Sequence, residues 1–286
     1  MNRTRLIYAA MAGAALAAAA TGAWACPGAG VITRIEGRPQ DMVIQREGTP
    51  VARPRVLEVL CEGDTIRVQN GAVATLSIDG TGQVKVQGTQ VYTIGARKAA
   101  ASLAGNAYKN VSERVMPDMK RQPWDVRLRG PGPALGFALT SLASDQQMLS
   151  AGHRDLLIRL DGGVGSYQVE IADSAGAPLA SAQGRDSDIL LKNLSLAPGV
   201  YTIKATDGTG ASVHAKVKVV TDKPPMSSDY DGISDSEVHA AALAADLART
   251  KPDIWSLEAE QILGAAPTNG LDRESVFELI ESYGVS

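Results

Sequence analysis

LEVLCEGDTIRVQNGAVATLSIDGTGQVKV, the stretch from Leu57 to Val86, decides the fold of the first part of the chain. It contains three short runs with apolar residues at alternate positions, the pattern of half-buried β-strands. The runs are separated by Glu62-Gly63-Asp64, Asn70-Gly71 and Asp79-Gly80, which are typical of tight turns between antiparallel strands. The stretch therefore predicts an antiparallel β-sheet.

The same alternation divides each predicted strand into an inward and an outward row. Ile66 and Val68 fall in the inward row of the first run, and Ala72, Ala74, Leu76 and Ile78 form the inward row of the second. Two further runs with turn signals, 31–35 and 42–46, precede the stretch and extend the sheet. We expect a partner-binding surface on the outward row, which consists of Thr65, Arg67, Gln69, Thr75 and Ser77.

The order of these runs resembles the periplasmic domain of the ferric-citrate regulator (FecR) family over about residues 30–95. The matching residues are Val43, Arg46 and Gly48 in the second strand, Leu60, Gly63, Asp64 and Ile66 in the core motif, and Asp79-Gly80 in the last hairpin. The resemblance implies an antiparallel β domain that contacts another protein or a glycan.

The chain departs from the family at its N-terminus. Family members that control a sigma factor carry a cytoplasmic head and a membrane helix, whereas here Arg3 and Arg5 precede an apolar run, 6–20, and the small residues Ala23 and Ala25. This pattern predicts a secretory signal peptide, residues 1–25, and hence export to the periplasm with no stable membrane span after cleavage. A retained anchor is disfavoured because the run is shorter than the ~20 residues that a bilayer needs.

The mature chain begins at Cys26 and contains one other cysteine, Cys61. An even pair of cysteines in an oxidising compartment predicts a disulfide bond. Acylation of Cys26, as in a lipoprotein, is the minority alternative, because Trp24 stands where such signals carry a small residue. Removal of Arg3 and Arg5 leaves 26 basic and 31 acidic residues, a net charge of −5, which disfavours a nucleic-acid partner.

The chain is predicted to be mainly β with a small helical part, and its domains follow one another in order. After the signal peptide come a FecR-like β domain (26–96), a helix and a Pro/Gly-rich linker (97–145), an immunoglobulin-like or fibronectin-like β-sandwich (146–222), a polar linker (223–233) and a helical tail (234–286). The basic residues Lys120, Arg121, Arg127 and Arg129 fall in the first linker, as a solvated face or a docking site for an acidic partner.

The tail contains three short amphipathic segments, 236–249, 253–263 and 272–283, and we expect them to form a small core of their own that includes Trp255 and Phe277. Asp229, Asp231, Asp235 and Glu237 before it resemble a calcium loop, but their spacing does not fit an EF-hand. Ser234 and Glu237 fit a capping box instead.

Motifs for catalysis or cofactor binding are missing from the sequence. His153, His214 and His239 are widely separated, and Gly165-Ser166 lacks the second glycine of a nucleophile elbow. We therefore expect no enzyme activity, no cofactor and no metal. The leading interpretation is an exported, non-enzymatic adaptor of a Gram-negative envelope that binds an envelope protein. The alternatives are a glycan or peptidoglycan binding module, disfavoured by the scarcity of aromatic side chains, and a hydrolase with paired carboxylates.

Overall fold

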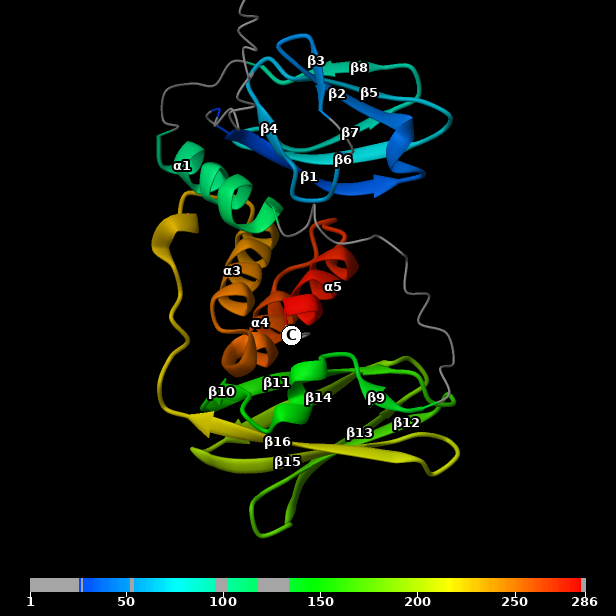
Figure 1. The fold of residues 1–286 in the computed structure, drawn as a ribbon, viewed down its shortest axis with the longest axis vertical. Coiled ribbons are helices and arrows are strands. Elements are labelled where there is room, and N and C mark those ends of the chain that lie inside the picture. Colours follow the sequence, from blue (N-terminus) through cyan, green and yellow to red (C-terminus); the bar gives the residue numbers. More distant parts are fainter. Residues whose placement is uncertain (1–25, 27, 52–53, 96–101, 118–133, 284–286) are drawn as a thin grey trace, which may run out of the picture.

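The structure is a computed structural model that describes residues 26, 28–51, 54–95, 102–117 and 134–283. The predicted signal peptide and the basic group 120–129 lie outside the described residues. Figure 1 shows three layers along the longest axis: a first β module, a layer of helices, and a β-sandwich. The described part of the chain is mainly β, as predicted from the sequence.

The first module consists of two antiparallel four-stranded sheets packed face to face. One sheet has the order β4 (Val59–Cys61), β1 (Gly28–Glu36), β6 (Val73–Ile78), β7 (Gly82–Gln87). The other has the order β3 (Thr49–Val51), β2 (Met42–Arg46), β5 (Thr65–Val68), β8 (Val91–Thr93). The predicted inward residues are confirmed, because Ile66, Val68, Ala72, Ala74, Leu76 and Ile78 are all buried in the core between the sheets.

The disulfide bond between Cys26 and Cys61 is present, with a Cα–Cα distance of 5.8 Å. It ties the start of β1 to the end of β4, which are neighbours in the same sheet. Cys61 is buried, so the bond anchors the start of β1 to the interior of the module.

The sandwich combines a five-stranded and a three-stranded sheet. The larger has the order β10 (Met148–Ser150), β16 (Ser212–Val220), β15 (Gly199–Thr206), β12 (Tyr167–Ala172), β13 (Pro178–Gly184), and β10 pairs with β16 in parallel. The smaller has the order β14 (Asp188–Leu196), β11 (Gly152–Asp161), β9 (Gly136–Phe137).

The sandwich begins earlier than the sequence pattern indicated, inside the segment 97–145 that we interpreted as helix and linker. β9 pairs with the end of β11, and a short helical turn, Thr140–Ser144, follows it. Leu139 and Leu142 of this segment are buried in the sandwich core. A two-residue strand that follows a Gly/Pro-rich stretch has too short an alternation to be recognised as a strand.

The helix predicted in the segment 97–145 is observed as α1 (Ser102–Asn110), continued by a π-helical turn, Val111–Val115. Ala107, Val111 and Val115 recur every four residues and are fully buried. They pack under the first module, beside the C-terminal helices.

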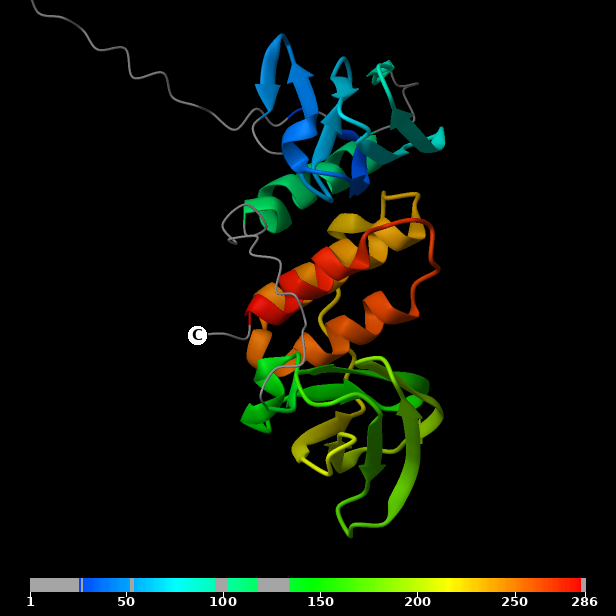
Figure 2. The ribbon, with the colours of Figure 1, turned by 90° about the vertical axis from the view of Figure 1, so that its right-hand side faces the viewer.

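The C-terminal helices are α3 (Ser236–Thr250), α4 (Pro252–Ala265) and α5 (Arg273–Tyr283). Trp255 and Phe277 are buried, as expected. However, the helices are not a tail, because they lie between the two β modules in both views (Figures 1 and 2). Their core is shared with α1 and with β1, β4 and the segment before β4, whose contributing residues are Val31, Val56, Leu57 and Val59.

Polar contacts join α4 and α5 to the sandwich. The Gln147 amide accepts a 2.8 Å hydrogen bond from the Leu257 N–H and donates a 2.9 Å bond to the Pro252 carbonyl. The Arg159 side chain has no solvent-exposed surface and pairs with Asp188 of β14 at 3.2 Å, and with Glu274 and Glu281 of α5 at 2.6 and 2.7 Å. The helices therefore fasten the two β modules together.

Candidate functional site

The outward row of β5 lies on a sheet face that no described element covers. Thr65 and Arg67 alternate with the buried Ile66 and Val68. In register, Arg67 lies between Val43 of β2 and Val91 of β8. Val91 is 50% exposed, and the exposed Arg67 has no ion pair with any described residue. Gln69 is also exposed, just beyond the strand.

Thr75 and Ser77 lie elsewhere, on β6 of the other sheet. Ser77 is only 3% exposed, and its hydroxyl donates a 2.8 Å hydrogen bond to Asp235 at the N-terminus of α3. The helical layer covers this outer face, so the five predicted residues do not share one surface. Alternation in the sequence finds the outward direction of each strand but cannot tell which sheet the strand joins or what covers it.

The Gly63-Asp64 motif has a structural role. Asp64 is 1% exposed, accepts a 2.8 Å hydrogen bond from the Cys61 N–H and pairs with Arg46 at 2.9 Å. Arg46 also donates a 2.8 Å hydrogen bond to the Val59 carbonyl. This pair joins the second strand to the turn before β5, which explains why an arginine and an aspartate occur at those two places.

The acidic residues Asp235 and Glu237, at the start of α3, bind different groups of the chain and do not converge on one point. Asp235 caps α3 by accepting from the N–H groups of Glu237 and Val238, so the cap lies one residue after the predicted Ser234. The buried Glu237 accepts from the N–H groups of Asn269 and Leu271 and pairs with Arg273 at 2.6 Å. Among the described residues, no group of three histidine, cysteine or acidic side chains is placed to hold a metal.

Asp229 and Tyr230 connect the segment before α3 to the π-helical turn. A hydrogen bond from the Ser227 hydroxyl and the paired Arg114 guanidinium lower the pKa of Asp229 below its ordinary value. Burial is the main cause that raises the pKa of Tyr230 to about 12, assisted by the nearby Asp246. Neither residue lines the groove or the cleft described below.

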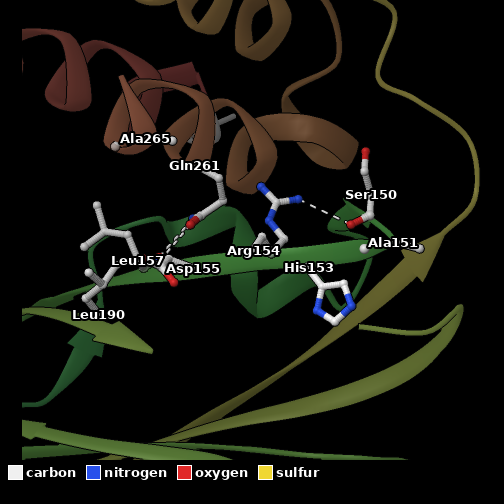
Figure 3. A pocket seen from close by; sticks show the side chains of 11 residues that line it. Ser150, Ala151, His153, Arg154, Asp155, Leu157, Leu190, Gln261 and Ala265 are labelled. Carbon is white, nitrogen blue, oxygen red and sulfur yellow. Dashed lines mark hydrogen bonds between the residues drawn. The ribbon is translucent and has the colours of Figure 1, made fainter. Parts of the chain in front are cut away.

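A groove of about 530 Å³ lies between β11 and α4 (Figure 3). Its size is within the range of small-molecule and peptide pockets. The sequence predicted a β-sandwich over 146–222 but gave no signal of the groove, because the helix that forms its second wall is about 100 residues away from β11. The residues that line it are Ser150, Ala151, Gly152, His153, Arg154, Asp155, Leu157, Leu190, Gln261, Gly264 and Ala265.

A second cleft, of about 590 Å³, lies between the β6–β7 hairpin, the N-terminus of α3 and the loop before α5. Most of its lining side chains carry hydroxyl, amide or carboxylate groups, and none is aromatic. They are Ser77, Gln83, Ser234, Asp235, Ser236, Thr268 and Asn269.

No family model and no curated protein match this chain. Among solved structures, CopC from Methylosinus trichosporium OB3b is 24% identical over 26% of this chain and 82% of its own, with a TM-score of 0.21. The fibronectin(III)-like modules of Clostridium thermocellum CbhA are 10% identical over 69% and 80%, with a TM-score of 0.22. The Porphyromonas gingivalis RgpB pro- and mature domain complex is 17% identical over 30% of this chain and 19% of that chain, with a TM-score of 0.25. Similarities at this level do not indicate a shared function.

Among the described residues, no helix is both long enough and apolar enough to cross a bilayer. The longest described helix, α3, has 15 residues and carries acidic and basic side chains.

Proposed function

We propose that the chain is an exported, non-enzymatic adaptor of the bacterial envelope, whose FecR-like first module contacts a protein partner. One observation carries the proposal: two uncovered sheet faces, one on each β module, lie on either side of a joint helical layer (Figure 1). The faces turned toward the helices pack against the helical layer, whereas no described element covers the outer faces.

The first of these faces is the sheet β3-β2-β5-β8, with Arg67 at its centre and the exposed Val91 beside it. An arginine flanked by apolar side chains is a frequent anchor of protein interfaces. The second is the five-stranded sheet of the sandwich, where Lys216 and Lys218 of β16 and Lys204 of β15 are exposed. Two faces held by one rigid body suit an adaptor that positions two partners.

The signal-peptide pattern and the Cys26–Cys61 bond support a periplasmic location, because disulfide bonds persist in oxidising compartments. Acylation of Cys26 would compete with this bond for the same sulfur atom.

Recovery of partners from cross-linked envelopes tests the proposal. A tagged chain carrying Arg67→Glu is compared with the wild type and with Lys85→Glu, which reverses an exposed charge on the covered sheet's edge strand β7. We expect Arg67→Glu to reduce recovery of a specific protein by at least tenfold and Lys85→Glu to leave it unchanged. Loss of a hot-spot arginine from an interface costs about 2 kcal/mol or more, and a tenfold change in affinity corresponds to about 1.4 kcal/mol. Equal recovery with Arg67→Glu would refute the assigned face.

The polar cleft supports the second candidate function, a glycan or peptidoglycan binding module, because amide and carboxylate side chains bind sugar hydroxyls by hydrogen bonds. Gln83 and Asn269 are exposed at its rim. Retention on purified cell-wall sacculi that is lost in the Gln83→Ala, Asn269→Ala double variant, without recovery of any protein, would favour this function over the adaptor.

A further inference from the structure

The edge of β11 that faces away from β14 is paired along only part of its length. β14 pairs with one edge of β11 from Gly152 to Arg159, with a register shift between Arg154 and Leu156 that places one extra residue in β14. Among the described residues, β9 pairs with the other edge only at Leu160 and Asp161. Backbone groups of a strand point alternately to its two edges, and the extra residue lies in β14 rather than in β11, so those of residues 153, 155, 157 and 159 point away from β14.

Two of these four positions have partners. The Arg159 carbonyl accepts a 2.9 Å hydrogen bond from the Ala138 N–H, next to β9. At Leu157 a side chain makes the hydrogen bonds that a neighbouring strand would make. The Gln261 amide of α4 accepts from the Leu157 N–H at 2.7 Å and donates to the Leu157 carbonyl at 2.9 Å. Figure 3 shows Gln261 reaching down from α4 to the strand.

The backbone groups of His153 and Asp155 continue this series into the groove. Within the described part of the chain, no strand or side chain bonds to them on this edge. The Asp155 carboxylate is turned to the other edge, where it accepts from the Asn193 N–H at 2.8 Å. The structure thus leaves two donors and two acceptors in the spacing of a β-ladder.

The groove around these groups has an apolar side and polar ends. Leu157 and Leu190 lie opposite each other in register, and Leu190 is 40% exposed despite its size. At one end, Arg154 pairs with Glu258 at 2.7 Å and donates to the Ser150 carbonyl at 3.3 Å. The Arg154 Nε–H is buried and has no hydrogen-bond partner among the described residues, which is an energetically costly state for a charged donor.

We propose that this groove binds an extended polypeptide segment, which adds to β11 as a short strand in the place that β9 and Gln261 fill farther along. The segment would form up to four backbone hydrogen bonds with His153 and Asp155 and place one apolar side chain over Leu190. Arg154 Nε–H would donate to a carbonyl at one end of the segment. Strand addition to a free sheet edge is a common mode of peptide recognition.

A polypeptide is favoured over a sugar or a lipid because the free groups are backbone donors and acceptors that alternate along a strand. This site lies in the sandwich, apart from the first-module face that contains Arg67. The two proposals therefore fail separately: Arg67→Glu tests the first, and substitutions in the groove test the second.

The test uses the mature chain with two synthetic peptides, one of alternating valine and threonine and one of alternating leucine and serine, both with blocked ends. Backbone amide exchange by NMR is measured with and without peptide. We expect the His153 and Asp155 amides to exchange at least fivefold more slowly with peptide. A matched peptide with N-methyl groups at alternate amides, which cannot form the ladder, should give no protection.

Variants locate the binding. Ala265→Trp fills the groove from the end of α4, and Leu190→Glu places a charge on its apolar side; both positions are exposed, so the fold should be kept. Each should weaken peptide binding at least tenfold, whereas Leu179→Glu, at a similarly exposed leucine of β13 on the other sheet, should not. If neither peptide binds at millimolar concentration, or if the N-methylated peptide binds equally well, the proposal is overturned.

Discussion

Replacement of Arg159 by methionine should destabilise the whole molecule, since this side chain links β11, β14 and α5. The Arg159 guanidinium has no exposed surface, pairs with three carboxylates and lies 4.0 Å from the centre of the Phe277 ring. Burial opposes its charge, and the three carboxylates outweigh that effect, so the pKa of Arg159 is raised.

The magnitude follows from what the substitution leaves behind. Removal of one partner of a buried ion pair costs about 3–5 kcal/mol when the remaining charge stays buried. Here the side chains of Asp188 and Glu274 are 43% and 50% exposed, so water can hydrate their carboxylates once the arginine is gone. The Glu281 side chain is only 16% exposed, so its carboxylate stays largely buried. Methionine also retains the apolar packing on Phe277. We therefore expect a loss of about 3 kcal/mol, at the low end of that range.

Urea unfolding followed by circular dichroism measures this loss. Arg185→Met, which removes an exposed arginine on the connection between β13 and β14, serves as the matched control and should change stability by less than about 0.5 kcal/mol. A loss below about 1 kcal/mol in Arg159→Met, with an unchanged dependence on urea, would refute the argument that this arginine fastens α5 to the sandwich.

Three further predictions concern other parts of the molecule. The Cys26→Ala, Cys61→Ala double variant should lose about 3–4 kcal/mol in urea unfolding, because the bond closes a loop of 35 residues, and labelling of the native protein should find no free thiol at either position. The lowered pKa of Asp229 means that its contribution to stability is present above the ordinary value of 3.8 and is lost as pH falls through the lower folded value; Asp229→Asn should flatten the acid side of a stability–pH curve, and an unchanged curve would contradict this. Gln261→Met should cost about 1–3 kcal/mol, because it leaves two backbone groups on the strand edge unpaired, and should speed amide exchange at Leu157; unchanged exchange there would count against the bidentate contact.

Local patterns predicted much of the first module. Alternation correctly assigned the buried face of β5 and β6, because period-2 burial is a property of each strand alone. The cysteine pair was found from the count of cysteines and the expected compartment. The FecR-like resemblance of residues 30–95 stays a prediction, because no family model matches the chain.

Assembly of the modules could not be predicted in the same way. The helices 236–283 looked like a terminal unit with a core of their own, because nothing in residues 57–59 indicates that Leu57 and Val59 pack on helices about 180 residues later. Likewise, Ser77 looked like an exposed polar residue, whereas its hydroxyl is buried against the cap of α3. Contacts between distant segments depend on topology, which alternation does not encode.

We infer that the helical layer holds the two outer sheet faces in one fixed arrangement. Spin labels introduced by cysteine substitution at Arg67 on the first face and Lys204 on the second, with the native disulfide kept intact, measure this arrangement directly by pulsed electron paramagnetic resonance. We expect one narrow distance distribution that matches the separation of these positions in the structure. A broad or multiple distribution, as two modules on a flexible connection would give, would contradict it.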